Sequence, residues 1–293
     1  MSYNLVMKSP FILENQTEYI SWRDKKLSLY PKDIESLSIS FDFEDININK
    51  ITQLKKIVKD YNFAIYNFSA QVSDEKLQEF CVQLNLTSSV SNLLADQNGI
   101  SSITDNSSLV QKKSNIEYIP YTNKPLNWHT DGYYHPLNST VKSFLLHCSQ
   151  PAQEGGENLL LDHEILYILL RDYNPDFINV LMQENIMEIP KNKNSKSSLS
   201  SIGPVFYIDT ENFLNMRFTS RQQNIIWKKD DMIKKIKNYI FSFILDDDKY
   251  IFKLLLKKNQ GYLANNILHK REKYLDGENK RLLKRLRFSE RIR

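Results

Sequence analysis

Residues 127–136 read NWHTDGYYHP, and this stretch carries the most specific chemical pattern in the chain. His129 and Asp131 stand two positions apart. Because alternate residues of a β-strand point to the same face, a strand here would bring an imidazole and a carboxylate to one point. Zinc and iron accept nitrogen and oxygen ligands of this kind. A hydrogen-bonded His–Asp pair beside a turn has the same spacing, so the motif alone leaves both interpretations open.

A third histidine, His269, ends the apolar run YLANNILH (262–269), which we expect to form one strand. Two histidines and one carboxylate on one side of iron form the facial triad, which leaves coordination positions open for a co-substrate and O2. The basic segment that follows holds Arg281 and Arg285. Arginine stays protonated and binds carboxylates through paired hydrogen bonds, so these residues suit a dicarboxylate co-substrate.

With these segments in order, the sequence resembles the taurine dioxygenase (TauD/TfdA-like) family and its clavaminate synthase-like relatives. The resemblance covers about residues 60–290 and rests on four successive motifs: NWHTDGYYHP, PAQEGGENLLLD (151–162), KKNQGYLANNILHKR (257–271) and DGENKRLLKRLRF (276–288). It implies a double-stranded β-helix, or jelly roll, and an oxygenase that uses Fe(II), 2-oxoglutarate and O2.

The resemblance also implies roles for single residues. The iron ligands match His129, Asp131 and His269. Arg281 matches the arginine that binds the distal carboxylate of 2-oxoglutarate, and Arg285, on the same face of the expected strand, matches a position that contacts an anionic group of the substrate or the co-substrate. The family usually has threonine after the paired glycines, where this chain has Asn158; its amide can still donate a hydrogen bond to 2-oxoglutarate.

Other residues of the first motif are candidates for substrate contact: Asn127, Tyr133, Tyr134 and His135. Ordinary packing or surface hydrogen bonding is the alternative explanation for each of them. The resemblance implies hydroxylation of an unactivated C–H bond in a small polar or anionic molecule, such as an amino acid derivative, a carboxylate or a sulfonate, with release of succinate and CO2. Desaturation and cyclisation are alternative outcomes of the same chemistry.

The pattern of apolar residues predicts an α+β fold with a β-rich core flanked by helices. We expect one dioxygenase domain over 1–293, with a lid-like loop at about 87–124 and a polar insert at about 191–201. Near the N-terminus, the alternating runs LSLYP (27–31) and LSISFDF (37–43) predict strands.

Composition excludes several classes of protein. A hydrophobic fraction of 41% in 293 residues supports a packed core and excludes a mainly disordered chain. No run reaches the roughly 20 apolar residues of a membrane span, and the first residues lack the apolar region of a signal peptide. Two cysteines are too few for a disulfide framework. We therefore expect a cytoplasmic protein that acts on a small molecule; the sequence does not indicate an oligomeric state.

The net charge of +4 comes from the end of the chain, where residues 270–293 hold ten Lys or Arg and four Asp or Glu. Such a segment could bind nucleic acid, but a dicarboxylate-binding role for its arginines makes a nucleic-acid partner the weaker interpretation. A larger or carrier-bound substrate, a non-catalytic jelly roll, and a zinc hydrolase with the same three ligands are also compatible with these motifs.

Overall fold

The computed structural model describes residues 8–42, 44–90, 99–106, 119–191, 200–244 and 248–293. The chain divides into two compact units that interleave in sequence. The first comprises Met1–Lys32, Gly132–Thr140 and Leu161–Ile251, and the second comprises Asp33–Asp131, Val141–Leu160 and Phe252–Arg293. The expectation of one domain over the whole chain stays a prediction.

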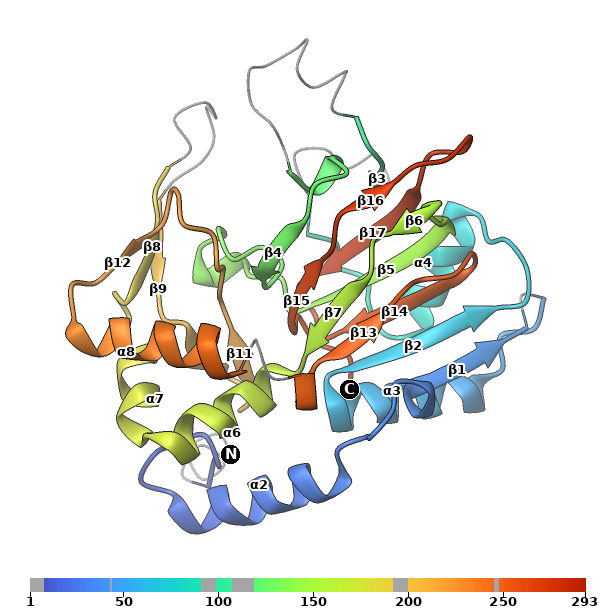
Figure 1. The fold of residues 1–293 in the computed structure, drawn as a ribbon. Coiled ribbons are helices and arrows are strands. Elements are labelled where there is room, and N and C mark those ends of the chain that lie inside the picture. The colour runs from blue at the N-terminus through green and yellow to red at the C-terminus, as the bar shows by residue number, and fades with distance from the viewer. Residues whose placement is uncertain (1–7, 43, 91–98, 107–118, 192–199, 245–247) are drawn as a thin grey trace. The chain divides into compact units, whose positions relative to one another are not determined.

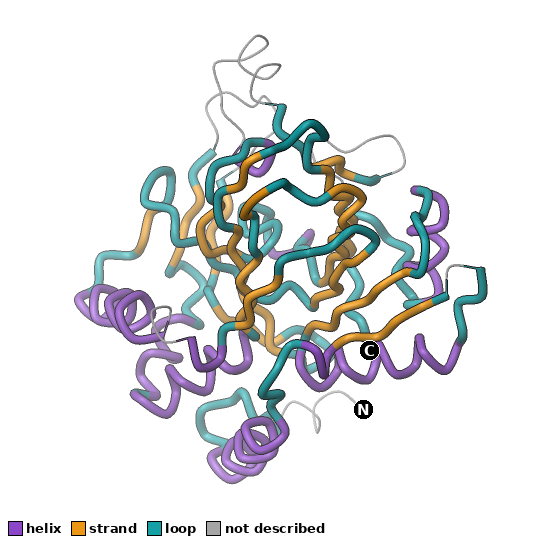
Figure 2. Tube along the Cα trace, turned by 45° about the vertical axis from the view of Figure 1, so that its right-hand side comes forward, coloured by secondary structure: helices purple, strands orange, loops and turns teal. Residues whose placement is uncertain are grey.

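A six-stranded sheet forms the larger layer of the second unit (Figures 1 and 2). Its strands, in order across the sheet, are β1 (Ser38–Phe41), β2 (Phe63–Phe68), β14 (Gln260–Ala264), β5 (Ser143–Gln150), β17 (Leu282–Phe288) and β3 (Ser101–Ile103). Strands β1 and β2 are parallel, and the other neighbouring pairs are antiparallel. The sheet thus joins segments that are far apart in the sequence.

The two faces of this sheet bury different sets of side chains. Leu145 and Leu263 point to the face covered by α3 (Ile48–Tyr61) and α4 (Asp74–Gln83). Leu146 and Tyr262, each one position away, point to the opposite face. This alternation follows from the two-residue period of a strand. The helices begin where the side chains of Asn47 and Ser73 accept hydrogen bonds from first-turn amides.

A four-stranded sheet contributes to the second apolar cluster, on the opposite face of the six-stranded sheet from α3 and α4. Its order is β13 (Phe252–Leu254), β7 (Asn158–Leu161), β15 (Leu268–Arg271) and β4 (Leu126–His129). Leu160 and Leu254 from this sheet share the cluster with Phe144, Leu146 and Tyr262 from the larger sheet. A short ladder pairs β6 (Glu154–Gly155) with β16 (Tyr274–Leu275). Two sheets therefore enclose one core in the second unit.

The first unit is mainly helical. Its helices are α2 (Gln16–Leu29), α6 (His163–Tyr173), α7 (Pro175–Leu181) and α8 (Asp231–Tyr239), the last continued by a π-helical turn at Ile240–Ile244. Its strands are β8 (Met187–Ile189), β9 (Ser201–Gly203) and β12 (Ile226–Trp227) in one sheet, and β10 (Phe206–Ile208) with β11 (Leu214–Met216) in a hairpin. Lys26 is buried between the carboxylates of Asp162 (2.7 Å) and Glu164 (2.6 Å), which satisfy its charge.

The strand prediction for 27–31 is wrong, because residues 27–29 form the last turn of α2. Tyr19 and Lys26, two turns apart on that helix, are both buried, and the Tyr19 hydroxyl donates to Asp172 at 2.6 Å. These contacts at helical spacing outweigh the local alternation of apolar residues. The prediction for 37–43 is confirmed over β1.

The run YLANNILH is not one strand. Strand β14 ends at Ala264, and His269 lies on β15 in the other sheet. Between them Asn266 adopts a left-handed backbone conformation (φ +50°), which asparagine tolerates better than most residues and which ends the strand. The chain thereby crosses from the six-stranded to the four-stranded sheet.

The predicted loop at 87–124 is interrupted by regular structure. Strand β3 lies within it and pairs with β17, and a 3₁₀ turn covers Ile119–Tyr121. Residues 91–98 and 107–118 of this loop, and residues 192–199 of the predicted polar insert, lie outside the described residues. The α+β, β-rich class is confirmed. None of the helices in the described part of the chain has the length and apolarity needed to cross a membrane.

Candidate metal centre

Two neighbouring strands bring the predicted histidines together. Strands β4 and β15 are antiparallel, and His129 lies directly opposite His269 in their register. The centroids of the two imidazole rings are 4.3 Å apart. Asp131 follows β4 by two residues, and one ligand atom from each of the three side chains lies within 4.8 Å of the others. All three residues are buried, so they form a compact set of two nitrogens and one carboxylate oxygen.

Backbone carbonyls fix the orientation of both imidazoles. Nδ1 of His129 lies 2.8 Å from the Asn127 carbonyl oxygen, and Nδ1 of His269 lies 3.0 Å from that of Ile267. A carbonyl accepts only from a protonated nitrogen, so each Nδ1 carries a hydrogen, and in the neutral imidazole Nε2 is then the nitrogen with the lone pair. Burial, together with the nearby His129, lowers the pKa of His269 to about 3. His269 is therefore neutral near pH 7, as a metal ligand must be.

Two arginines hold the carboxylate of Asp131. Arg287 donates from Nε to Oδ2 at 2.9 Å, and Arg285 donates from Nη1 to Oδ1 at 3.4 Å. Burial alone would raise the pKa of Asp131, but the charges of Arg285 and Arg287 outweigh it and keep this pKa well below its usual value. Oδ1 also faces Nε2 of His129 at 3.7 Å. The carboxylate is thus ionised and directed toward the histidines.

Hydrogen bonds from one side chain also fix the backbone of Asp131. Asn266, at the crossover between β14 and β15, accepts from the Asp131 amide at 2.7 Å. Its Nδ2 donates to the carbonyl oxygens of Asp131 (2.9 Å) and Val141 (2.6 Å). The turn that follows β4 is therefore attached to the turn that precedes β15.

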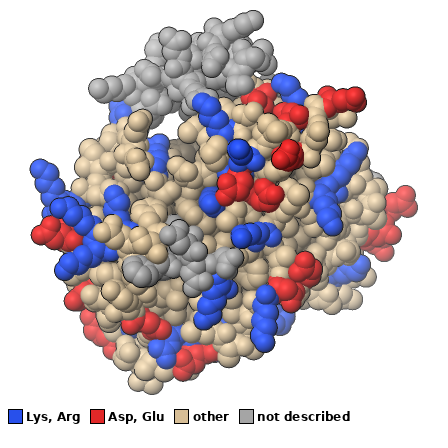
Figure 3. All heavy atoms as spheres, in the orientation of Figure 1, with Lys and Arg blue, Asp and Glu red and all other residues tan. Residues whose placement is uncertain are grey.

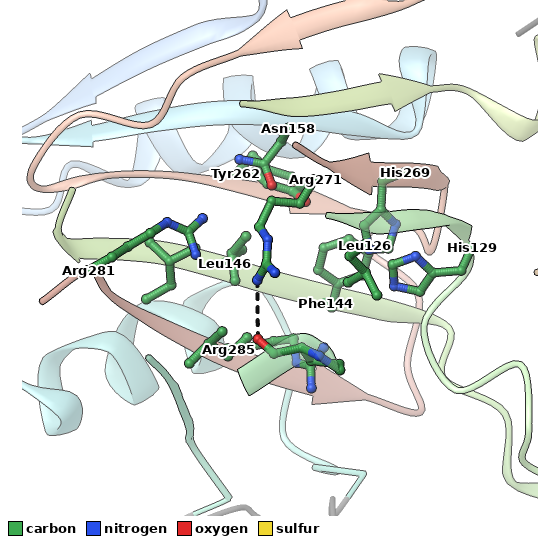
Figure 4. Close-up of a pocket in the computed structure, with 13 residues that line it drawn as sticks. Leu126, His129, Phe144, Leu146, Asn158, Tyr262, His269, Arg271, Arg281 and Arg285 are labelled. Carbon is green, nitrogen blue, oxygen red and sulfur yellow. Dashed lines mark hydrogen bonds between the residues drawn. The ribbon is translucent and has the colours of Figure 1, made fainter. Parts of the chain in front are cut away.

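A pocket opens beside the histidines within the second unit (Figure 4). Its lining comes from both sheets and from the segment before β4: Ile103, Pro120, Leu126, His129, Phe144, Leu146, Asn158, Tyr262, His269, Arg271, Arg281, Leu283 and Arg285. Three of these residues are arginines, whereas none is an acid. The pocket therefore favours an anionic ligand.

Arg281 has an unused hydrogen-bond donor in this pocket. It is buried, its guanidinium lies 4.7 Å from the centroid of the Tyr274 ring, and its Nη1 has no hydrogen-bond partner in the described part of the chain. Gly156 leaves the necessary space, because a Cβ there would lie 3.2 Å from the Tyr274 side chain and 3.4 Å from Nε of Arg281. Gly156 thus allows Arg281 and Tyr274 to approach.

Arg271 has a different role, because backbone carbonyls occupy most of its donors. Its guanidinium donates to the carbonyl oxygens of Pro120 (3.1 Å, dashed in Figure 4), Thr122 (2.8 Å) and Lys124. These residues lead into β4, and Pro120 lines the pocket. Arg271 therefore fixes the segment that carries His129 to the strand that carries His269.

The remaining predicted site residues divide between the two units. Asn158 lines the pocket, and its Nδ2 donates to the Leu254 carbonyl oxygen at 3.4 Å. The Asn127 side chain is exposed and is not part of the pocket lining, although its carbonyl orients His129. Tyr133, Tyr134 and His135 belong to the first unit, where Arg217 donates from Nε to the Tyr133 carbonyl oxygen at 2.8 Å. Substrate contact by these four residues stays a prediction.

Sequence reasoning missed four residues of the site: Arg271, Arg287, Asn266 and Tyr262. Arg287 follows Arg285 by two positions on a strand, so the same alternation that groups Arg281 with Arg285 could have found it. Asn266 and Tyr262 give no such signal, because they lie in an apolar run that is typical of an ordinary core strand. Their roles depend on where that run bends.

Comparison with known proteins identifies the family. The family model described as taurine catabolism dioxygenase TauD, TfdA family, matches residues 26–287. The chain belongs to this family. The resemblance predicted from the four motifs is thereby confirmed. Among curated proteins, this TauD/TfdA family member is 25% identical over 166 residues to a uridine-5'-phosphate dioxygenase of a Streptomyces species, a match that covers 53% of the chain and 58% of the relative. The chain spans little more than half the length of the curated relatives it matches.

Solved structures share the fold of this TauD/TfdA family member. PvcB, described as an Fe, alpha-ketoglutarate dependent oxygenase, has a TM-score of 0.57 at 12% identity, with 86% of this chain and 85% of PvcB covered. The non-heme iron oxygenase OrfP, solved with Fe, succinate and (3S)-hydroxy-L-Arg, has a TM-score of 0.59 at 14% identity, with 83% and 80% covered. At these identities the likeness concerns the fold. The names of the family and its relatives support the predicted enzyme class and its cofactors.

Proposed function

We propose that the protein is an Fe(II)- and 2-oxoglutarate-dependent dioxygenase that hydroxylates a small anionic molecule. The observation that carries this proposal is the group of His129, Asp131 and His269 beside a pocket lined by arginines. Two histidines and a carboxylate are the ligand set of non-haem iron oxygenases. Bound iron with 2-oxoglutarate and O2 would supply the oxidant that hydroxylates an unactivated C–H bond, with release of succinate and CO2.

The residues present fit both groups. Each histidine presents an Nε2 lone pair, and Asp131 presents an ionised carboxylate, which together match a divalent cation. The unpartnered Nη1 of Arg281 fits a carboxylate, because guanidinium donors bind carboxylate oxygens strongly. In this proposal Arg281 holds the distal carboxylate of 2-oxoglutarate, and Asn158 contributes to the same binding site.

The chain's own contribution is orientation and exclusion of water. Carbonyl acceptors, Arg287 and Asn266 set the three ligands before iron binds, which lowers the reorganisation needed on binding. Phe144 packs against His269, with ring centroids 4.9 Å apart, and Leu146 and Leu283 add to the apolar part of the lining. Such a lining keeps bulk water from the reacting atoms.

The positive charge of the pocket supports an anionic substrate. Arg285 and Arg287 share the single carboxylate of Asp131, and Nε of Arg285 has no partner in the described part of the chain. We propose that Arg285 contacts a carboxylate, sulfonate or phosphate of the substrate. A nucleoside 5'-phosphate is the first class to test, since the Streptomyces relative is named a uridine-5'-phosphate dioxygenase.

The arrangement of the second unit also supports the predicted jelly roll. A six-stranded and a four-stranded sheet share one apolar core, and the proposed iron ligands lie on the smaller sheet and the turn after it. We propose that these two sheets are the two layers of a double-stranded β-helix.

Anaerobic titration tests the proposed cofactors without knowledge of the substrate. Purified protein with Fe(II) should develop a visible charge-transfer band on addition of 2-oxoglutarate, and His129→Ala or Asp131→Ala should abolish it. Lys284→Gln is the matched control, because Lys284 lies on β17 but pairs with Asp74 outside the pocket. With O2 and the true substrate, the wild type should then release succinate.

Two results would contradict the proposed function or its ligand assignment. A protein that binds Zn(II) at these residues but forms no band with Fe(II) and 2-oxoglutarate would be a zinc protein with the same ligands. Full turnover by a folded Asp131→Ala variant would falsify the ligand assignment.

A further inference from the structure

The hydroxyl of Tyr262 is a buried polar group without a hydrogen-bond partner among the residues that the structure describes. Tyr262 lies in the middle of β14, its side chain is 0% exposed, and it lines the pocket. A buried hydroxyl without a partner destabilises the folded state, so such groups in native proteins call for a specific explanation. A ligand atom in the pocket would supply the missing acceptor.

Aromatic packing connects Tyr262 to the metal centre through Phe144. Phe144 contacts His269 with ring centroids 4.9 Å apart and contacts Tyr262 with ring centroids 5.6 Å apart. The charges of Asp131, Arg285 and Arg281 all act on the Tyr262 hydroxyl, so it lies near both a proposed metal ligand and Arg281. The phenol is therefore suited to the part of a ligand that extends from the metal toward Arg281.

Two other hydrogen-bonding side chains of the pocket lining already donate to acceptors in the chain. The Asn158 amide already donates to the Leu254 carbonyl, and Arg285 donates to Asp131. Nη1 of Arg281 and the hydroxyl of Tyr262 have no partners in the described part of the chain, and neither do Nε of Arg271 and Nε of Arg285. One carboxylate group can accept hydrogen bonds from both Arg281 and Tyr262, because its two oxygens offer about four lone-pair sites.

We propose that Tyr262 binds the distal carboxylate of 2-oxoglutarate, together with Arg281, by donating its hydroxyl hydrogen. This assignment rests on the proposed function. Burial raises the pKa of Tyr262 above its ordinary value, and so the hydroxyl keeps the hydrogen that it donates. Tyr262 is then a co-substrate-binding residue supplied by the larger sheet, opposite the metal ligands on the smaller one.

Tyr262→Phe tests the assignment, because it removes the hydroxyl and keeps the ring that packs on Phe144. In anaerobic titrations with Fe(II), the Kd of 2-oxoglutarate should rise about 10- to 100-fold, the range expected for a hydrogen bond to a charged group. The second probe is 2-oxopentanoate, which has a methyl group in place of the distal carboxylate. Its Kd should be the same for the wild type and the variant.

Tyr66→Phe is the matched control. Tyr66 is a fully buried tyrosine on the neighbouring strand β2, and its hydroxyl contacts Nδ1 of His147 at 3.2 Å on the other face of the sheet. This variant should bind 2-oxoglutarate as the wild type does. Without ligand, Tyr262→Phe should unfold at the same temperature as the wild type or higher, whereas a purely structural hydroxyl would lower that temperature.

Each result has a distinct meaning. An unchanged Kd for 2-oxoglutarate in Tyr262→Phe, or an equal loss for both 2-oxo acids, would overturn the role of Tyr262 while leaving the proposed function intact. A wild-type protein that forms no band with Fe(II) and 2-oxoglutarate would overturn the proposed function and the role of Tyr262 with it.

Discussion

The carboxylate of Asp131 is held by more contacts than metal coordination alone requires. Arg287 donates its shorter hydrogen bond to Oδ2, at 2.9 Å, while Oδ1 faces His129. An arginine on the outer oxygen leaves the inner oxygen for the metal and prevents rotation of the group. Partners of this kind commonly change metal affinity when they are removed.

Arg287→Gln should therefore weaken Fe(II) binding by about 10- to 100-fold. The glutamine amide nitrogen occupies the position of Nε, but glutamine lacks the rest of the guanidinium and the charge that keeps Asp131 ionised. The Fe(II) dissociation constant, measured anaerobically, checks this expectation. Lys284→Gln removes the same charge from the other face of β17, where Lys284 contacts Asp74 and Ser102. Equal affinities in the two variants would mean that Arg287 acts only through the general charge of the strand.

At the scale of residues, the sequence predicts site residues that recur at a regular spacing or belong to a family motif. It does not predict site residues whose role depends on where the chain turns from one sheet to the other. His129 and Asp131 follow from a two-residue period, and the position of Arg281 in the pocket follows from a family motif. Tyr262 could not be distinguished from a core tyrosine, because its hydroxyl matters only where the second sheet leaves a pocket in front of it. Asn127 shows the opposite case, since its carbonyl rather than its side chain takes part in the site.

At the scale of elements, the crossover between β14 and β15 connects the two sheets and positions the metal centre. Asn265 and Asn266 form it. Asn265 exchanges hydrogen bonds with the backbone of Ile292, and Asn266 makes three with Asp131 and Val141. One asparagine thus attaches the C-terminal segment, and the other attaches the turn that carries Asp131.

Two variants, Asn266→Gly and Asn266→Ala, separate the effect of the hydrogen bonds of Asn266 from the effect of its left-handed backbone conformation. Glycine keeps the left-handed backbone but loses the hydrogen bonds, so we expect a loss of about 3 kcal/mol in the free energy of unfolding. Alanine also strains the backbone and should lose about 1 kcal/mol more. Chemical denaturation measures both values. A glycine variant as stable as the wild type would show that the hydrogen bonds contribute nothing.

A positive-φ asparagine elsewhere provides the control for Asn266. Asn212 has a φ of +67° in the turn between β10 and β11, and its side-chain Oδ1 has no hydrogen-bond partner in the described structure. Asn212→Gly should change the free energy of unfolding by less than about 0.5 kcal/mol.

Elements with strong periodicity were predictable from the sequence, whereas their ends were not. Helix α3 and strand β2 occur where the apolar spacing indicates them. The break after Ala264 was missed because YLANNILH is apolar enough for one continuous strand, and only contacts from Asn266 to a segment 135 residues away fix the turn. Contacts at such separation leave no local pattern.

At the scale of the whole molecule, half of the basic residues in the C-terminal segment 270–293 are buried. Arg271, Arg281, Arg285, Arg287 and Arg291 are all buried. On the face shown in Figure 3, Lys and Arg side chains are interspersed with Asp and Glu. The charge count predicted where the positive charge lies along the chain, but only the strand pairing of β17 shows that it faces a pocket. The internal position of these arginines supports a small anionic ligand over a polyanion.

Stability of the whole fold should depend on pH through His147. This histidine is 1% exposed in the middle of the six-stranded sheet, with Nδ1 next to the Tyr66 hydroxyl and its ring stacked on that of Tyr66 at 5.9 Å. Burial lowers the pKa of His147 from 6.5 to about 4. Below pH 6.5 the unfolded chain therefore binds a proton that the folded chain rejects, and folding becomes less favourable as the pH falls.

Between pH 7 and pH 4 this histidine should remove about 3 kcal/mol from the free energy of unfolding, since each unit of pKa shift corresponds to about 1.4 kcal/mol. The loss should begin near pH 6.5 and level off below pH 4. Urea unfolding of the wild type and His147→Gln across this range measures it as the difference between the two curves. The variant should be less stable than the wild type at pH 7 and should lose that disadvantage on acidification. Parallel curves would show that another buried group controls the acid sensitivity of the fold.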